Sequence, residues 1–167
     1  MPRTHKRLLA ACGAAATAAA IALAGVTAAS AASPAVSGTE HFQFMTTSPT
    51  SSNASIIATG VFTAGGVDHP GRTTDTLVFP TGSFKVAHSK PTGTPTLNPK
   101  TCLVTATQTG TYTISGGTGA YSGISGHGTY QATILAVAAR TAQGTCSTTL
   151  APAAWQQIIK ASGQVHL

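Results

Sequence analysis

The sequence predicts an all-β protein, a single antiparallel β-barrel of about eight strands that is closed by one disulfide and preceded by a cleavable signal helix. Short segments of alternating apolar and polar residues recur along 33–167, with clusters of Gly, Pro, Asn and Asp between them. No long helical pattern and no internal repeat interrupts these segments. A glycine-rich segment at 110–130 favours a barrel over a sandwich.

Residues 1–32 have the features of a secretory signal peptide. A basic front containing Arg3 precedes an uncharged, alanine-rich run, and small residues predict cleavage after Ala32. A transmembrane anchor is the alternative, because the apolar run approaches the ~20 residues that span a bilayer. The cleavage site and the lack of a basic stop-transfer group disfavour an anchor. We therefore expect a secreted, extracellular barrel domain at 33–167 that has no stable membrane anchor after cleavage.

The segment 110–130 contains seven glycines and all three tyrosines of the chain. Tyr112 and Ile114 alternate with Thr and Ser, as in a half-buried strand. The glycines that follow can adopt positive φ without steric cost, so we expect a tight turn or an irregular barrel corner after this strand. The residues that form the pattern are Gly116, Gly117, Thr118, Gly119, Tyr121, Gly123 and Gly126.

This pattern resembles the GGTGxFxGAxG signature of the allene oxide cyclase and dirigent proteins. The chain is also similar to small secreted actinobacterial proteins described as allene oxide cyclase barrel-like. The resemblance implies an eight-stranded antiparallel barrel with an apolar cavity. Allene oxide cyclases use a buried glutamate with a bound water, and dirigent proteins use pocket aspartates and an arginine. The motif contains none of these groups, so the resemblance transfers the architecture and no active residue.

Composition excludes several classes of function. After signal removal six basic residues remain against three acidic ones, and they are scattered rather than clustered. A nucleic-acid surface needs clustered positive charge, so we expect no nucleic-acid partner. The sequence has no phosphate loop, HExxH, CxxC or nucleophile elbow, and its histidines stand singly. We expect neither a metal ion nor a cofactor.

Two cysteines remain in the exported chain, Cys102 and Cys146. An even pair in an exported protein is typical of one disulfide. A metal pair or a reactive thiol is the alternative, but no His or acidic residue lies near either cysteine in the sequence to support it.

Strand patterns extend over most of the exported chain. The segments with this pattern are 40–45, 55–62, 74–79, 83–89, 101–109, 129–140 and 153–167. The glycines and Asp68-His69-Pro70 at 65–71 predict a long turn in which Asp68 and His69 are solvated. Three prolines at 90–100 predict a surface loop. The last segment has a helical alternative at 153–160, which we disfavour because its surroundings are all β.

Two titratable residues are candidates for chemistry. Glu40 shares a strand face with Phe42, and His88 shares a face with Phe84. Such a group at the mouth of a cavity has a shifted pKa and can perform acid–base chemistry. The alternative, which we favour, is a strand end where the side chain reaches water. The residues expected to contact a ligand inside the barrel are Phe42, Phe44, Phe84, Val86, Tyr112 and Tyr130.

The leading functional hypothesis is a barrel that binds a small apolar molecule, or serves as a stable extracellular module, without catalysis. The alternative is an isomerase, cyclase or dirigent-like protein acting on an apolar substrate, with Glu40 as proton acceptor and Tyr112 or Tyr130 as donor. A third hypothesis is a surface-interaction protein with an apolar patch on its outer face. The sequence leaves open whether the chain forms a homo-oligomer.

Overall fold

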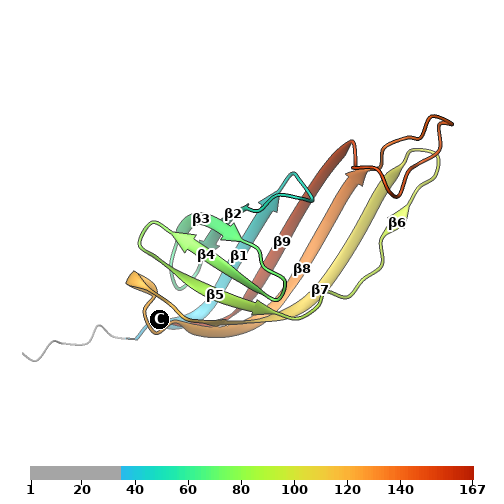
Figure 1. Cartoon of the computed structure of the whole chain (residues 1–167). Coiled ribbons are helices and arrows are strands. Elements are labelled where there is room, and N and C mark those ends of the chain that lie inside the picture. The colour runs from blue at the N-terminus through green and yellow to red at the C-terminus, as the bar shows by residue number, and fades with distance from the viewer. Residues whose placement is uncertain (1–34) are drawn as a thin grey trace, which may run out of the picture. The chain divides into compact units, whose positions relative to one another are not determined.

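The computed structural model describes residues 35–167, which form one antiparallel sheet that closes on itself (Figure 1). The predicted signal peptide lies outside the described residues. The elements are β1 (Ser37–Thr46), β2 (Ala54–Thr59), β3 (Ala64–His69), β4 (Thr74–Phe79), β5 (Gly82–His88), β6 (Thr96–Leu97), β7 (Leu103–Ser115), the 3-10 helix η1 (Gly119–Tyr121), β8 (Ser125–Val137) and β9 (Ala154–His166).

Strand pairing closes an eight-stranded barrel, which confirms the predicted fold class. Strands β1 to β5 pair in sequence order, β9 pairs with both β1 and β8, and β8 pairs with β7. The pair between β5 and β7 joins the two edges of the sheet. The short strand β6 pairs with β7 alone and lies outside the closed ring.

Strands β7, β8 and β9 are longer than the rest of the barrel. Only the last part of β7, from Tyr112 to Ser115, pairs with β5. The remainder of β7 continues beyond the barrel beside β8, as Figure 1 shows. The predicted disulfide is confirmed in this extension: Cys102 and Cys146, 44 residues apart in sequence, join the start of β7 to the loop after β8.

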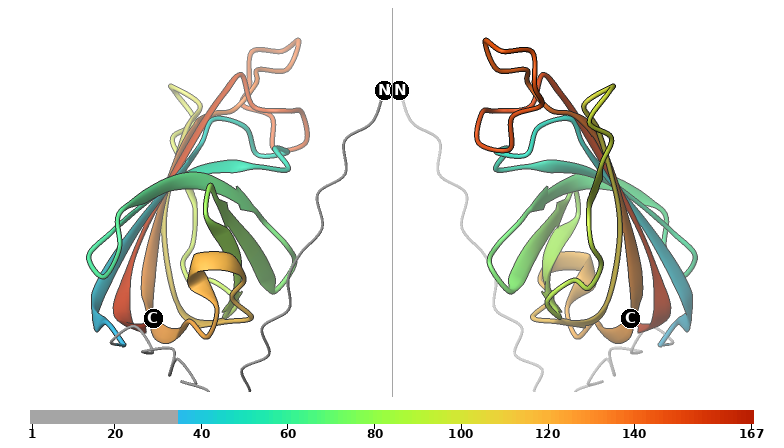
Figure 2. Two further views of the ribbon diagram at one scale, coloured as in Figure 1. Left: turned by 90° about the vertical axis from the view of Figure 1, so that its left-hand side faces the viewer. Right: turned by 90° about the vertical axis from the view of Figure 1, so that its right-hand side faces the viewer.

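The glycine motif forms the predicted corner. Gly116, Gly119 and Gly123 have φ values of 66°, 60° and 86°, a region that side chains with a β-carbon rarely adopt. The corner donates backbone hydrogen bonds to Thr81 in the turn between β4 and β5 and to Ser83 in β5. It also places Tyr121 and Ile124 in the core. Figure 2 shows the short helix at the same end of the barrel as the C-terminus. We call this the closed end.

Aromatic side chains fill the closed end. Their ring centroids lie 5.0–6.3 Å apart, mostly in tilted or edge-to-face arrangements. Such pairs add roughly 0.5–1.5 kcal/mol each beyond the burial of their area. The cluster consists of Phe42, Phe62, Phe79, Phe84 and Tyr121. Phe62 comes from the turn between β2 and β3, so this turn inserts a ring into the barrel.

The predicted long turn at 65–71 is wrong, because most of it is the strand β3. Gly65 and Gly66 are part of this strand. Gly66 faces inward, at a position where a larger residue would not fit. A β-carbon there would lie 2.7 Å from Cδ1 of Phe79. The other predicted strands are present, with β8 beginning four residues early at Ser125 and the last segment forming β9 rather than a helix.

Candidate functional site

A cavity of about 310 Å³ lies at the end of the barrel opposite the closed end. Its walls come from the last residues of β1, β3 and β5, the first residues of β2 and β4, and the middle of β7, β8 and β9. Residues of the loops after β1 and β3, including Pro49 and Pro70, form its rim. The volume is at the lower end of the range for small-molecule sites.

The cavity wall is mainly aromatic and aliphatic. Its apolar lining includes Phe42, Phe44, Leu77, Val86, Ala132, Ile159 and Ala161. Of the six residues expected to contact a ligand, five line the cavity: Phe42, Phe44, Val86, Tyr112 and Tyr130. Phe84 does not, because it is fully buried in the aromatic cluster toward the closed end.

Asp68 is the more buried of the two carboxyl groups in the cavity wall, with an exposed fraction of 4%. Its Oδ1 atom has no hydrogen-bond partner among residues 35–167. Burial raises the pKa of Asp68 from 3.8 to about 7, and the charge of Asp75 adds to this effect. The expectation of a solvated Asp68 is therefore wrong. The residue lies in β3, where the alternation of Ala64, Gly66 and Asp68 directs it to the inside.

Asp75 and His88 stand beside each other in the cavity wall, on the paired strands β4 and β5. Nε2 of His88 lies 3.3 Å from Oδ1 of Asp75. The same carboxylate oxygen accepts a 2.8 Å hydrogen bond from the amide of Gly71 in the rim. His88, a candidate from the sequence, is thus part of the cavity, whereas His69 is exposed.

Two tyrosines reach across the cavity wall over glycines of the neighbouring strand. Tyr130 is paired with Gly110, and Tyr112 with Gly128, two positions apart in the β7–β8 ladder. A β-carbon on Gly128 would lie 2.7 Å from the Tyr112 hydroxyl, and one on Gly110 would collide with the Tyr130 ring. The Tyr130 hydroxyl donates a 2.9 Å hydrogen bond to the carbonyl of Ser89. Glycine at these two positions therefore lets the rings lie flat against the sheet.

Glu40 does not line the cavity. It is fully buried toward the closed end, where its Oε2 atom accepts a 3.1 Å hydrogen bond from the amide of Phe62. Burial raises the pKa of Glu40, against the lowering effect of backbone hydrogen bonds from Phe62 and Val61. Its Oε1 atom has no partner in the described part of the chain. Neither expected position, a cavity mouth or a solvated strand end, matches this placement.

Glu40 and Tyr112 face each other across two glycines. The ladder pairs Tyr112 with Gly128, Gly128 with Gly163, and Gly163 with Glu40. With no side chains between them, the Tyr112 ring extends toward Glu40. Burial and the charge of Glu40 together raise the pKa of Tyr112 to about 12. Its hydroxyl is buried and has no hydrogen-bond partner within residues 35–167.

The sequence reasoning missed both aspartates of the cavity, Asp68 and Asp75. The signal was present: they flank the same turn, and Asp68 continues an inward alternation that starts at Ala64. Because the glycines of this segment were interpreted as turn residues, the alternation that places Asp68 on the inner face was not recognised. Within the described residues no three His, Cys, Asp or Glu side chains are grouped as a metal site requires.

Four of the nine exposed large apolar side chains within residues 35–167 lie in two separate cross-strand pairs. Val67 and Val78 form one pair on β3 and β4, and Leu103 and Val137 form another on the extension. No helix within 35–167 has the length and apolar character that crossing a bilayer requires.

The described chain is thus a closed antiparallel barrel with one end filled by aromatic rings and an acidic, mainly apolar cavity at the other. Comparisons with protein-family models, with curated proteins and with solved structures found no match to it.

Proposed function

We propose that this protein is a secreted barrel that binds a small, mainly apolar molecule in the cavity at its open end. One observation carries the proposal: the apolar cavity wall includes Asp68, a buried residue whose Oδ1 atom finds no partner within residues 35–167. Leaving such a group unpaired costs about 1–3 kcal/mol. Small-molecule sites combine an apolar wall with a few polar groups in this way.

The resemblance to the allene oxide cyclase and dirigent barrels supports the same proposal. The motif residues from Gly116 to Gly126 form the corner at the closed end, and the strands make the eight-stranded barrel that the resemblance implies. The Cys102–Cys146 disulfide supports export, since disulfides persist in oxidising compartments.

The test is to fill the cavity with a side chain. Ala132 is buried in the cavity wall, and Thr133, its neighbour on β8, is exposed on the outer face. Binding of the uncharged fluorophore N-phenyl-naphthylamine is measured for Ala132→Phe and for the control Thr133→Phe. We expect Ala132→Phe to weaken binding at least about tenfold, and Thr133→Phe to leave it unchanged. Equal affinities for the two variants would disprove binding in this cavity.

A second candidate function is isomerase or cyclase activity with Glu40 as proton acceptor. The observation that favours it is the buried pair of Glu40 and Tyr112, each with an atom that lacks a partner in the described chain. The hydrogen bond from Phe62 and the position of Glu40 outside the cavity weigh against it. If this candidate function is correct, the protein converts a co-purifying ligand into an isomer of equal mass. The Glu40→Gln variant should then stop this conversion. Conversion by Glu40→Gln at the wild-type rate would disprove it.

A further inference from the structure

We propose that the ligand of the cavity carries a positively charged amine on its apolar body, and that the carboxylates of Asp68 and Asp75 bind this amine. The inference rests on the proposed function and adds the chemical class of the ligand.

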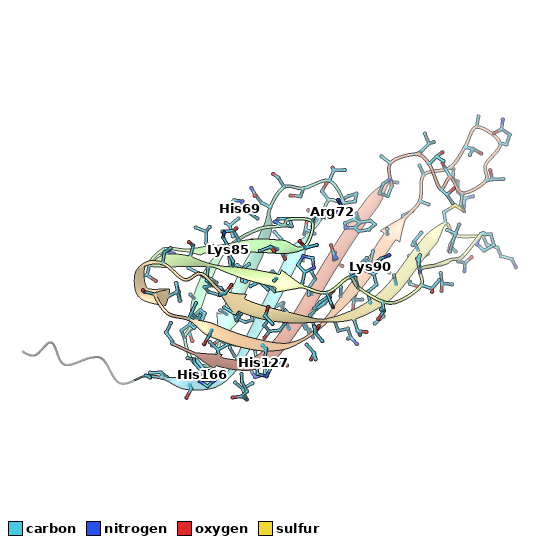
Figure 3. The ribbon with its side chains drawn as sticks, turned by 60° about the horizontal axis from the view of Figure 1, so that its bottom comes forward. His69, Arg72, Lys85, Lys90, His127 and His166 are labelled. Carbon is cyan, nitrogen blue, oxygen red and sulfur yellow. A yellow bond between two sulfur atoms is a disulfide. The ribbon has the colours of Figure 1, made fainter. Side chains whose placement is uncertain are left out.

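The charges of the protein are distributed unequally between the cavity and the outer surface. The chain has three acidic residues, and two of them, Asp68 and Asp75, line the cavity. All Lys and Arg side chains in 35–167 are exposed, and none lines the cavity. Figure 3 shows Arg72, Lys85 and Lys90 on the loops and the outer surface. In this basic protein the cavity is thus lined by two carboxyl groups and by no Lys or Arg of residues 35–167.

The carboxylate of Asp68 is the group in the cavity that a bound cation would stabilise most. It is 4% exposed, and its Oδ1 atom has no donor within the described chain. Asp75 is partly compensated, because it accepts a hydrogen bond from Gly71 and lies beside His88. A buried carboxylate with neither a donor nor a counter-ion is costly, and the nearby negative charge of Asp75 increases the cost. A ligand ammonium group would supply both the donor and the opposite charge.

The remainder of the wall accommodates the apolar body of such a ligand. Phe42, Phe44, Leu77 and Ile159 provide an aromatic and aliphatic surface. The aromatic rings also attract a cation placed over their faces. An anionic ligand would instead meet two carboxylates and no Lys or Arg of residues 35–167, so the cavity selects against carboxylates and phosphates.

The test compares three probes that share one ring system and differ in charge: naphthylmethylamine, naphthalenemethanol and naphthoic acid. Isothermal titration calorimetry measures their affinities at pH 8. We expect the amine to bind at least about tenfold more tightly than the alcohol, as a charge-assisted hydrogen bond predicts, and the acid to bind most weakly. Binding of the alcohol reports the proposed function, and the preference for the amine reports this inference.

Three variants test which residues produce the preference for the amine over the alcohol. Asp68→Asn should remove most of this preference, measured as the ratio of amine to alcohol affinity on the same variant, since an amide keeps the shape and loses the charge. Asp75→Asn should reduce it in part, and this variant tests the inference independently if Asp68→Asn does not fold. Thr107→Lys, on the exposed face of β7, changes the net charge by the same amount and should leave the preference intact.

The pH dependence of amine binding is a further readout. The titratable groups that line the cavity with Asp68 are Asp75 on β4, His88 on β5, Tyr112 on β7 and Tyr130 on β8, while β1, β2 and β9 contribute uncharged residues. The pKa of Asp68 is about 7, so below that pH the carboxyl must lose a proton before it can pair with an amine. Amine affinity should therefore rise as pH increases through 7, and alcohol affinity should not.

The outcomes separate the two proposals. If the alcohol binds and the amine binds no more tightly, the inference is overturned and the proposed function stands. If the alcohol does not bind, the proposed function fails and the inference fails with it. If Thr107→Lys removes the amine preference as fully as Asp68→Asn does, the preference comes from net charge and the inference is overturned.

Discussion

The amide of Phe62 donates a 3.1 Å hydrogen bond to Oε2 of Glu40, and this contact joins β1 to the turn between β2 and β3. The same turn carries the Phe62 ring into the aromatic cluster, where its centroid lies 5.0 Å from that of Tyr121. A buried carboxylate thus positions the residue that helps to fill the closed end. Gly60 makes the approach possible, since a β-carbon there would collide with the backbone carbonyl of Thr39 and lie 3.0 Å from Cα of Glu40.

Removal of the Glu40 side chain should destabilise the barrel. Glu40→Ala leaves the Phe62 amide without its acceptor and creates a cavity, so the free energy of unfolding should fall by about 2–4 kcal/mol. Glu40→Gln keeps an acceptor oxygen and should cost less than Glu40→Ala. Urea denaturation measures both, with Gln43→Ala on the exposed face of β1 as a control that should change little. If Glu40→Ala is as stable as this control, Glu40 does not anchor the turn.

The stability of the protein should fall as pH rises from about 4 to about 7. In the unfolded chain Asp68 loses its proton near 3.8, whereas in the folded chain it keeps the proton up to about pH 7. The folded state therefore binds more protons than the unfolded state across this window, and stability is lost as they dissociate. At about 1.4 kcal/mol per pH unit the loss from this one group amounts to at most roughly 4 kcal/mol.

Asp68→Asn isolates this effect, because Asn cannot ionise. The variant should be more stable than the wild type at pH 8 and similar to it at pH 4, as measured by urea denaturation at both values. Glu40 contributes to the pH dependence of both proteins in the same direction, so the difference between them reports Asp68. Equal stability of the two proteins at pH 8 would show that the carboxylate of Asp68 is not costly in the folded state.

The inward glycines opposite the tyrosines should not tolerate a methyl group. In Gly128→Ala the new β-carbon would collide with the backbone carbonyl of Ser162 and lie 2.7 Å from the Tyr112 hydroxyl, so the sheet must shift. We expect a loss of about 1–3 kcal/mol. Gly65→Ala is the matched control on β3, where a β-carbon meets nothing within 4 Å and φ is not in the positive region. It should be neutral or stabilising by up to about 1 kcal/mol. A Gly128→Ala variant that melts at the wild-type temperature would contradict this arrangement.

Loss of the disulfide should affect the extension more than the cavity. Replacing Cys102 and Cys146 by Ser frees a loop of 44 residues and should lower the free energy of unfolding by about 2–4 kcal/mol. Hydrogen exchange should accelerate in the loop 138–153 and at the start of β7, and change little in β1 to β5. Binding of N-phenyl-naphthylamine should persist, since the cavity wall contains no residue of that loop. Loss of binding in this variant would show that the extension shapes the cavity.

The local patterns of the chain were sufficient to predict most strands. Alternation identified β1, β4, β5 and β9, the spaced glycines from Gly116 to Gly123 identified the corner, and an even cysteine pair identified the disulfide. These features depend on neighbours in sequence: a strand repeats every two residues, and positive φ requires glycine. β3 was missed because a glycine in a strand and a glycine in a turn look alike in sequence.

The make-up of the site depends on contacts between residues far apart in the chain. Alternation places Phe42 and Glu40 on one face of β1. Only barrel closure and the inserted Phe62 turn keep Glu40 out of the cavity, while Phe42 contacts the aromatic cluster on one side and lines the cavity on the other. Likewise, Asp68 and Asp75 become the charge of a cavity only because β5 pairs with β7. Short-range patterning specifies which residues share a face. Pairing between strands that are distant in sequence then determines which face lies inside the barrel and which groups are buried. The burial of Asp68 that results raises its pKa.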